Sequence, residues 1–216
     1  MCGRFTLTTR DLAELARTWA AEVDAALAAG WRPRFNVAPG DPHPVLRAEA
    51  GRRRLVPAAF GLTGPAGLVI NARAETAATR PTFREAWQGR RAVVPADGFF
   101  EWEGPPTARR PTWFHAPDGG PLLLAALLGP APGGGDGFAI VTTAACPPVS
   151  RLHDRMPVIL PPEALDAWLS GPPPALRPPR DGALAARPVS SRVNAVGNDD
   201  EGCLGPPEPP RQGSLF

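Results

Sequence analysis

Short apolar runs, each ended by glycine, proline or polar residues, dominate the chain from residue 68 onward. Runs of this length that are rich in branched and aromatic side chains are typical of β-strands. The pattern predicts strands at Leu68–Asn71, Ala92–Pro95, Phe99–Glu103, Thr112–His115, Leu122–Leu127, Phe138–Thr143 and Pro157–Leu160. Strand-like sequence returns at Arg187–Val193, after the Pro/Gly-rich stretch Gly171–Pro179.

Helical periodicity is confined to a few segments. Leu12, Leu15, Ala16 and Trp19 recur at helical spacing after Thr9, which predicts a helix running toward Gly30. Two shorter helices are expected at Thr82–Trp87 and Glu163–Leu169. The segment Arg34–Gly40, which contains proline and glycine, is expected to be a loop. Many short strands with few helices predict an α+β fold, a single domain on a curved, largely antiparallel sheet.

The composition changes near the C-terminus. From Gly205 the chain reads Gly-Pro-Pro-Glu-Pro-Pro, which favours an extended segment with little to bury. We therefore expect one domain over residues 1–204 and a tail over residues 205–216.

All 23 basic residues are arginine, so the chain has no lysine. Schiff-base chemistry normally uses a lysine amine. Any such chemistry here would have to use the amino terminus. The formal net charge of +2 neither requires nor excludes a polyanionic partner.

The three cysteines and three histidines are scattered, which argues against a disulfide framework and against a zinc site. No signal-like segment and no apolar run of membrane-spanning length occurs. We expect a cytoplasmic monomer that uses no cofactor and no metal.

The most reactive candidate is Cys2. Loss of Met1 would give this residue a free α-amine beside its thiol, and such a pair condenses with an aldehyde to an imine and then to a thiazolidine ring. The alternative is that Cys2 is an incidental residue of a frayed terminus.

Five ordered motifs give this candidate a context. They are Met1–Phe5, Arg34–Gly40, Ile70–Thr76, Asp97–Trp102 and His153–Pro157. Together they resemble the SRAP family, the SOS response-associated peptidase or abasic-site processing proteins, over about residues 1–204. The resemblance implies a barrel-like sheet with flanking helices, and a protein that binds abasic sites in single-stranded DNA and crosslinks to them through Cys2.

The resemblance also implies catalytic roles for Asn71, Glu101 and His153. Glu101 lies among aromatic residues, where a raised pKa would suit proton transfer, although an exposed strand residue is the alternative. His153 would assist opening of the sugar ring, unless Asp154 simply holds its imidazole. Asn71 would orient the α-amine, although asparagine at a strand end is commonly a turn former.

DNA contacts are expected from further residues. Arg4 and Arg73 would hold phosphates beside the lesion, with Arg80, Arg84 and Thr142 continuing the track. Asn36 and Pro39 would contact bases, and Phe60 would stack on one where the family usually has tryptophan. For the arginines the alternative is a solvated surface charge.

The extreme C-terminus carries a separate motif. Gln212, Leu215 and Phe216 resemble the short peptide by which bacterial repair proteins dock onto the sliding clamp. A chance match, or a tail that packs on the domain, is the alternative.

Two rival functions fit part of the pattern. Met-Cys-Gly also opens N-terminal-nucleophile glutamine amidohydrolases, but this chain has no Asn-Gly dipeptide for an oxyanion site. A non-catalytic single-strand DNA-binding module is the other alternative. The expected enzyme is an abasic-site crosslinking protein, with removal of Met1 and a latent lyase activity as accompanying reactions.

Overall fold

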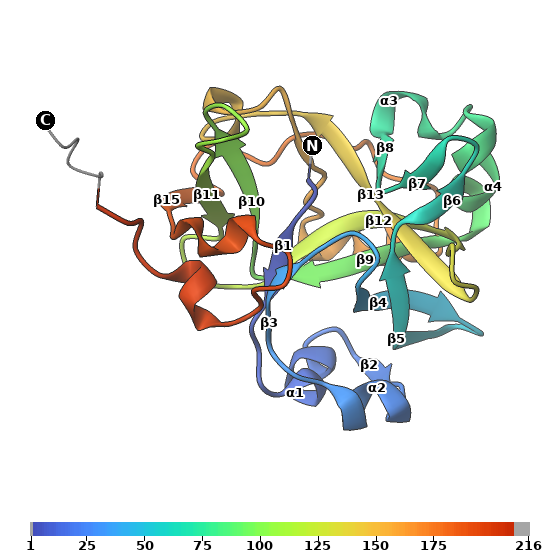
Figure 1. The fold of residues 1–216 in the computed structure, drawn as a ribbon. Coiled ribbons are helices and arrows are strands. Elements are labelled where there is room, and N and C mark those ends of the chain that lie inside the picture. The colour runs from blue at the N-terminus through green and yellow to red at the C-terminus, as the bar shows by residue number, and fades with distance from the viewer. Residues whose placement is uncertain (1, 210–216) are drawn as a thin grey trace, which may run out of the picture.

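The computed structural model describes residues 2–209, and strands account for most of its regular structure (Figure 1). The strands are β1 Phe5–Leu7, β2 Ala21–Val23, β3 Arg34–Val37, β4 Pro42–Glu49, β5 Arg52–Phe60, β6 Leu62–Gly64, β7 Gly67–Val69, β8 Asn71–Arg73, β9 Arg91–Ala96, β10 Gly98–Glu103, β11 Arg110–His115, β12 Leu122–Pro130, β13 Asp136–Ala144, β14 Arg155–Pro157 and β15 Ala185–Pro188. The α-helices are α1 Leu12–Arg17, α2 Ala25–Gly30, α3 Ala74–Ala77, α4 Pro81–Gly89 and α5 Leu165–Leu169.

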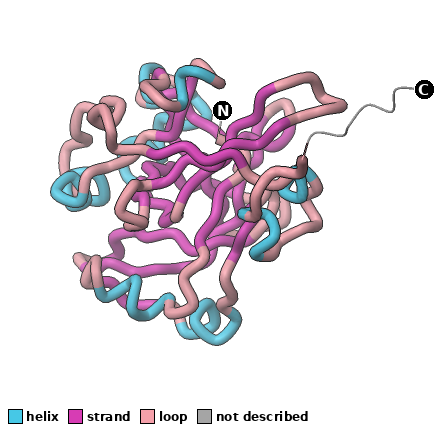
Figure 2. Tube along the Cα trace, turned by 90° about the vertical axis from the view of Figure 1, so that its left-hand side faces the viewer, coloured by secondary structure: helices cyan, strands magenta, loops and turns pink. Residues whose placement is uncertain are grey.

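The larger sheet closes on itself. Its strands follow the order β14-β13-β12-β9-β4-β5-β2, and β5 also pairs with β13 in parallel, with Gly137 opposite Ala59 and Phe138 opposite Phe60. This pairing closes β5, β4, β9, β12 and β13 into a small barrel. Figure 2 shows the strands at the centre of the molecule and the short helices around its periphery.

The second sheet carries the amino terminus. Its order is β15-β11-β10-β1-β3, so that β1 lies between β10 and β3. The chain from Ser190 to Gly205 then crosses this sheet, and Val193 and Cys203 pack against Phe100 there. The first and last parts of the domain are therefore held by the same sheet.

Two large apolar clusters stabilise the barrel. One lies where the helices cover it and includes Leu46, Leu55 and Trp168. The other joins the barrel to the second sheet, with Phe5 and Phe99 packed among barrel residues. Each fully buried side chain of this size contributes roughly 1.5–3 kcal/mol of transfer free energy.

The structure confirms the α+β class and the largely antiparallel, curved sheet. The predicted strands around β9 to β13 are present, as are the helices near α4 and α5. The helix expected from Thr9 toward Gly30 is instead two short helices separated by β2, because the chain turns at Ala20, which has a positive φ of 49°. The expected loop at Arg34–Gly40 begins as β3.

The expected C-terminal tail is described only as far as residue 209. The Glu208 carboxylate accepts hydrogen bonds from the Ser190 hydroxyl at 2.6 Å and from the Ser191 amide at 3.0 Å, which fastens the start of this segment to the domain. Gln212, Leu215 and Phe216 lie outside the described residues, so the boundary at residue 204 and the clamp-binding motif stay predictions.

Gly98 provides a test of how tightly the second sheet is packed. A Cβ atom there would lie 2.5 Å from the Phe114 carbonyl oxygen and 2.5 Å from the Trp113 indole nitrogen. We expect Gly98→Ala to lower the free energy of unfolding by about 1–3 kcal/mol, because backbone and ring must both move.

The matched control is Gly89→Ala in α4, where a Cβ atom would meet nothing within 4 Å. That substitution should be neutral or stabilising by up to about 1 kcal/mol, because glycine is the more flexible residue in the unfolded chain. Urea unfolding of both variants gives the comparison, and equal stability of the two would contradict the described packing.

Candidate functional site

The register of the second sheet brings the amino-terminal segment to Glu101. Phe5 is paired with Phe99, and the Phe100 amide donates a hydrogen bond to the Arg4 carbonyl at 3.0 Å. Continued by two residues, this antiparallel register sets Gly3 opposite Glu101. The first residues of the chain are thereby directed at the one buried carboxylate of β10.

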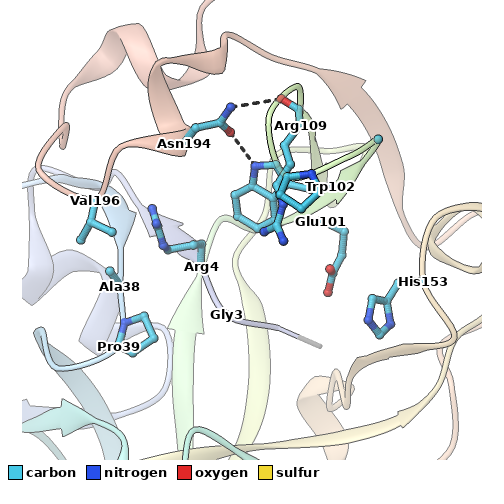
Figure 3. Close-up of a pocket in the computed structure, with 12 residues that line it drawn as sticks. Gly3, Arg4, Ala38, Pro39, Glu101, Trp102, Arg109, His153, Asn194 and Val196 are labelled. Atoms are coloured by element: carbon cyan, nitrogen blue, oxygen red, sulfur yellow. Dashed lines mark hydrogen bonds between the residues drawn. The ribbon is translucent and has the colours of Figure 1, made fainter.

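A cavity of about 940 Å³ lies at this point (Figure 3). The N-terminal segment, β10 with its following turn, the loop before β14 and the C-terminal segment all contribute to it. Its lining residues are Gly3, Arg4, Ala38, Pro39, Glu101, Trp102, Gly104, Pro106, Arg109, His153, Asn194 and Val196. Residues that are far apart in the sequence therefore line one cavity, and they include two of the predicted catalytic residues, Glu101 and His153.

Asn71 holds the backbone of Cys2. It is the first residue of β8, and its side-chain amide donates to the Cys2 carbonyl at 3.0 Å. Its side-chain oxygen is buried and has no hydrogen-bond partner among residues 2–209. A buried acceptor without a partner is costly, so this oxygen is a ready site for an N–H donor near Cys2.

Cys2 has no exposed surface. Burial, and next the negative charge of Glu101, raise the pKa of its thiol far above the usual value. The thiol is therefore protonated at neutral pH in this environment.

Glu101 is 4% exposed. Burial is the main cause that raises its pKa to about 7, and the nearby charge of Asp154 acts in the same direction. A carboxyl group with this pKa both accepts and donates a proton near neutral pH, which suits general acid–base catalysis.

His153 faces the same part of the cavity as Glu101 (Figure 3). The Arg155 amide donates to its Nδ1 at 2.9 Å, while an Asp154 carboxylate oxygen lies 2.9 Å from the same nitrogen. The two contacts require different protonation states. We favour the neutral ring with its proton on Nε2, because burial lowers the pKa of His153 and the Asp154 side chain is 85% exposed.

Arg4 is fixed beside these groups. Its guanidinium donates to the Asn36 side-chain oxygen at 2.6 Å and to the Val193 carbonyl at 3.1 Å, and it lies 5.9 Å from the centre of the Trp102 ring. Its hydrogen-bond partners are neutral, so its positive charge is available to an anion in the cavity.

The structure corrects the expected base contact by Asn36. This side chain is fully buried, and its amide group donates to the carbonyls of Val193, Ala195 and Asn198. Because its carbonyl oxygen is also used by Arg4, Asn36 has no capacity left for a base, and it positions Arg4 and the C-terminal segment instead.

Two further expected DNA contacts are buried. Phe60 is 0% exposed and stacks on Phe138 with ring centres 5.1 Å apart, inside the second apolar cluster. Thr142 is 1% exposed, and Arg155 donates to its carbonyl at 2.6 Å. Neither side chain can reach a nucleic acid in this conformation, because the sheet pairing that the sequence did not reveal covers both.

The remaining expected contacts are exposed. Pro39 lies on the rim of the cavity. Arg73, Arg80 and Arg84 are exposed around α3 and α4, and they are not among the residues that line the cavity. Their contact with DNA stays a prediction.

Sequence reasoning missed Arg109, Asn194 and Val196, and it treated Trp102 only as a neighbour of Glu101. Asn194 and Val196 follow the strand-like run ending at Val193, and nothing in their local sequence indicates proximity to residue 4. Packing of the C-terminal segment across the second sheet brings them to the cavity.

Comparison with known proteins settles the family. The model of the family described as SOS response associated peptidase (SRAP) matches residues 1–196. The chain belongs to the SRAP family. A curated relative, the abasic site processing protein YedK of Escherichia coli (strain K12), is 37% identical over 180 residues, covering 78% of this chain and 79% of the relative.

More distant relatives extend the family membership beyond bacteria. The abasic site processing protein HMCES of Gallus gallus is 29% identical over 229 residues, covering 82% of this chain and 67% of that protein. A crystal structure of a protein from Bacteroides thetaiotaomicron aligns with a TM-score of 0.78 over 95% of this chain and 99% of that one, at 18% identity, which supports the fold alone.

No group of three histidine, cysteine or acidic side chains within residues 2–209 is arranged to hold a metal ion. Cys2, Cys146 and Cys203 are all free thiols. In the same part of the chain, no helix has the length and apolar character needed to cross a membrane.

The raised pKa of Glu101 gives a stability prediction. A carboxyl group whose pKa rises on folding, here from 4.5 to about 7, binds its proton more tightly in the folded state. Its contribution to stability is therefore favourable at low pH and is lost as the pH rises from about 4.5 through 7. We expect Glu101→Gln to unfold at higher urea concentration than the parent at pH 8, with the difference shrinking toward pH 5.

Glu103→Gln is the control, because it removes an exposed carboxylate from the same strand. A Glu101→Gln gain that is the same at pH 5 and pH 8 would contradict the buried, raised-pKa carboxyl group.

Proposed function

We propose that this protein binds abasic sites in single-stranded DNA and crosslinks to them through Cys2. The observation that carries the proposal is the sheet register that directs the amino-terminal segment at Glu101, in a cavity that also contains His153 and Arg4. The relatives are named abasic site processing proteins, and these names indicate the same class of substrate, abasic sites. The crosslink would shield the lesion during the response to DNA damage.

The nucleophile is the α-amine of Cys2, which becomes available when Met1 is removed. The Asn71 side-chain oxygen, which has no hydrogen-bond partner within residues 2–209, supports this assignment, since it would accept a hydrogen bond from that amine and orient its lone pair. No other primary amine competes, because the chain contains no lysine.

The reaction needs two bond-forming steps. The amine adds to the C1′ aldehyde of the abasic sugar, and loss of the resulting hydroxyl as water gives an imine. The Cys2 sulfur then adds to the imine carbon and its proton ends on the nitrogen, closing the thiazolidine. A thiol kept protonated by burial suits this order, because the amine reacts first and the thiol still carries the proton that the ring nitrogen needs.

Glu101 and His153 move the protons. Glu101 takes a proton from the attacking amine and returns one to the departing hydroxyl, for which a pKa of about 7 is well matched. The Nε2–H of His153 donates to the ring oxygen of the closed sugar and so assists release of the aldehyde.

The first proposed phosphate contact is Arg4. Hydrogen bonds to two neutral groups position its guanidinium beside the reacting residues and do not neutralise its positive charge. Pro39 on the rim and the exposed Arg73, Arg80 and Arg84 are the proposed outer contacts, while Asn36, Phe60 and Thr142 support them from the interior.

Three finer activities belong to the same proposal. The family name suggests that the protein removes Met1 itself, and an imine that fails to close would allow strand cleavage by β-elimination. The tail with Gln212, Leu215 and Phe216 would dock on a sliding clamp.

The rival amidohydrolase and the non-catalytic binding module have less support. Neither function requires an amine that reacts with aldehydes beside a carboxyl group whose pKa is about 7.

Cys2→Ala separates the two chemical steps. This variant keeps an α-amine after loss of Met1, so we expect borohydride to trap it on an abasic oligonucleotide. Without borohydride, a denaturing gel should show no lasting adduct, because no thiol is present to close the ring.

The parent protein serves as the control and should give a heat-stable adduct with or without borohydride. An equally heat-stable, untrapped adduct from Cys2→Ala would contradict the thiazolidine.

A further inference from the structure

The cavity extends well beyond the reactive residues. Its far end is formed by the turn between β10 and β11 and by the C-terminal segment, through Trp102, Gly104, Pro106, Arg109, Asn194 and Val196. Cavities of roughly 300–1,000 Å³ commonly hold ligands of drug size. A volume of about 940 Å³ therefore leaves room for more than the abasic sugar and its phosphate.

Asn194 fixes this far end (Figure 3). Its side-chain amide donates to the Arg109 carbonyl at 3.1 Å, and its side-chain oxygen accepts from the Trp102 indole at 2.7 Å. One side chain thus joins the C-terminal segment to both ends of the turn. A turn held in this way loses little conformational entropy when a ligand binds.

Arg109 supplies an available positive charge. It is exposed, it lines the cavity, and it makes no ion pair with any residue in the described range 2–209. The next residue behaves differently, since the Arg110 guanidinium is paired with the Glu103 carboxylate at 3.0 Å. A guanidinium without a carboxylate partner, held on a fixed turn, is suited to a phosphate.

We infer that Arg109 binds a backbone phosphate beyond the nucleotide that adjoins the abasic site in the same strand, on a turn that Asn194 positions. This inference rests on the proposed function, because it assumes that the abasic sugar occupies the reactive end with its phosphate near Arg4. The strand then runs along the cavity from Arg4 to Arg109, and a nucleotide beyond the adjoining one lies at the far end.

The test compares binding of single strands of different length. A tetrahydrofuran analogue of the abasic site has no aldehyde, so binding reaches equilibrium without crosslinking. One oligonucleotide carries a single nucleotide on each side of the analogue, and two others add four nucleotides on the 5′ or the 3′ side. Fluorescence anisotropy over a range of salt concentrations gives Kd and its salt dependence.

We expect the parent protein to gain affinity from extension on one side. Arg109→Gln should lose that gain, with Kd for the extended strand weaker by roughly two- to fivefold, the size of one exposed charge contact. Its salt slope should fall by about 0.7, the value for one phosphate of a single strand. Arg110→Gln should keep both the gain and the slope.

Asn194→Ala should lose part of the same gain, although it removes no charge. Full retention of the gain in Asn194→Ala would contradict the positioning of the turn.

Two results overturn the inference. One is an Arg109→Gln variant with the parent's gain and salt slope, and the other is a variant that loses affinity equally for the short and the extended strands. Failure of the proposed function gives a different result, because the parent protein would then form no crosslink to an aldehyde-bearing strand, whatever its affinity for the analogue.

Discussion

The pairing of β1 with β10 is the constraint on which the site depends. Phe5 and Phe99 are opposite each other and both fully buried, so the register is fixed by packing as well as by backbone hydrogen bonds. A shift by one residue would turn both side chains out of the core. The same register delivers the amino-terminal segment to Glu101, so the geometry of the reactive end follows from the stability of the sheet.

The groups at this end are held in states that cost stability. Glu101 and the Cys2 thiol are buried, and the Asn71 side-chain oxygen lacks a hydrogen-bond partner among residues 2–209. The surrounding sheet and two apolar clusters offset these costs, since they retain large buried side chains such as Phe5, Phe138 and Trp168. The buried Glu101 carboxyl group is therefore kept ready to exchange a proton near neutral pH.

Local sequence was sufficient for strands β9 to β13 and for naming the candidate reactive residues, but not for β1 to β6, which it did not predict. The aromatic residues around Glu101 and the chemistry of Cys2 can be recognised without a structure, and the five motifs indicated the family. Long-range pairing could not be deduced: closure of the barrel by β5 and β13 buries Phe60, and β14 with β8 buries Thr142. The burial of Asn36 also depends on a contact, with the chain near Val193, that no local pattern encodes.

The central claim is that the α-amine and thiol of Cys2 together capture the aldehyde of an abasic site. Intact-mass spectrometry of the protein, before and after incubation with an abasic oligonucleotide, tests it most directly. The account predicts a protein lacking Met1 and then an adduct equal to protein plus oligonucleotide minus one water, with the modification mapped to Cys2. An unmodified protein, or an adduct located at any other residue, would contradict it.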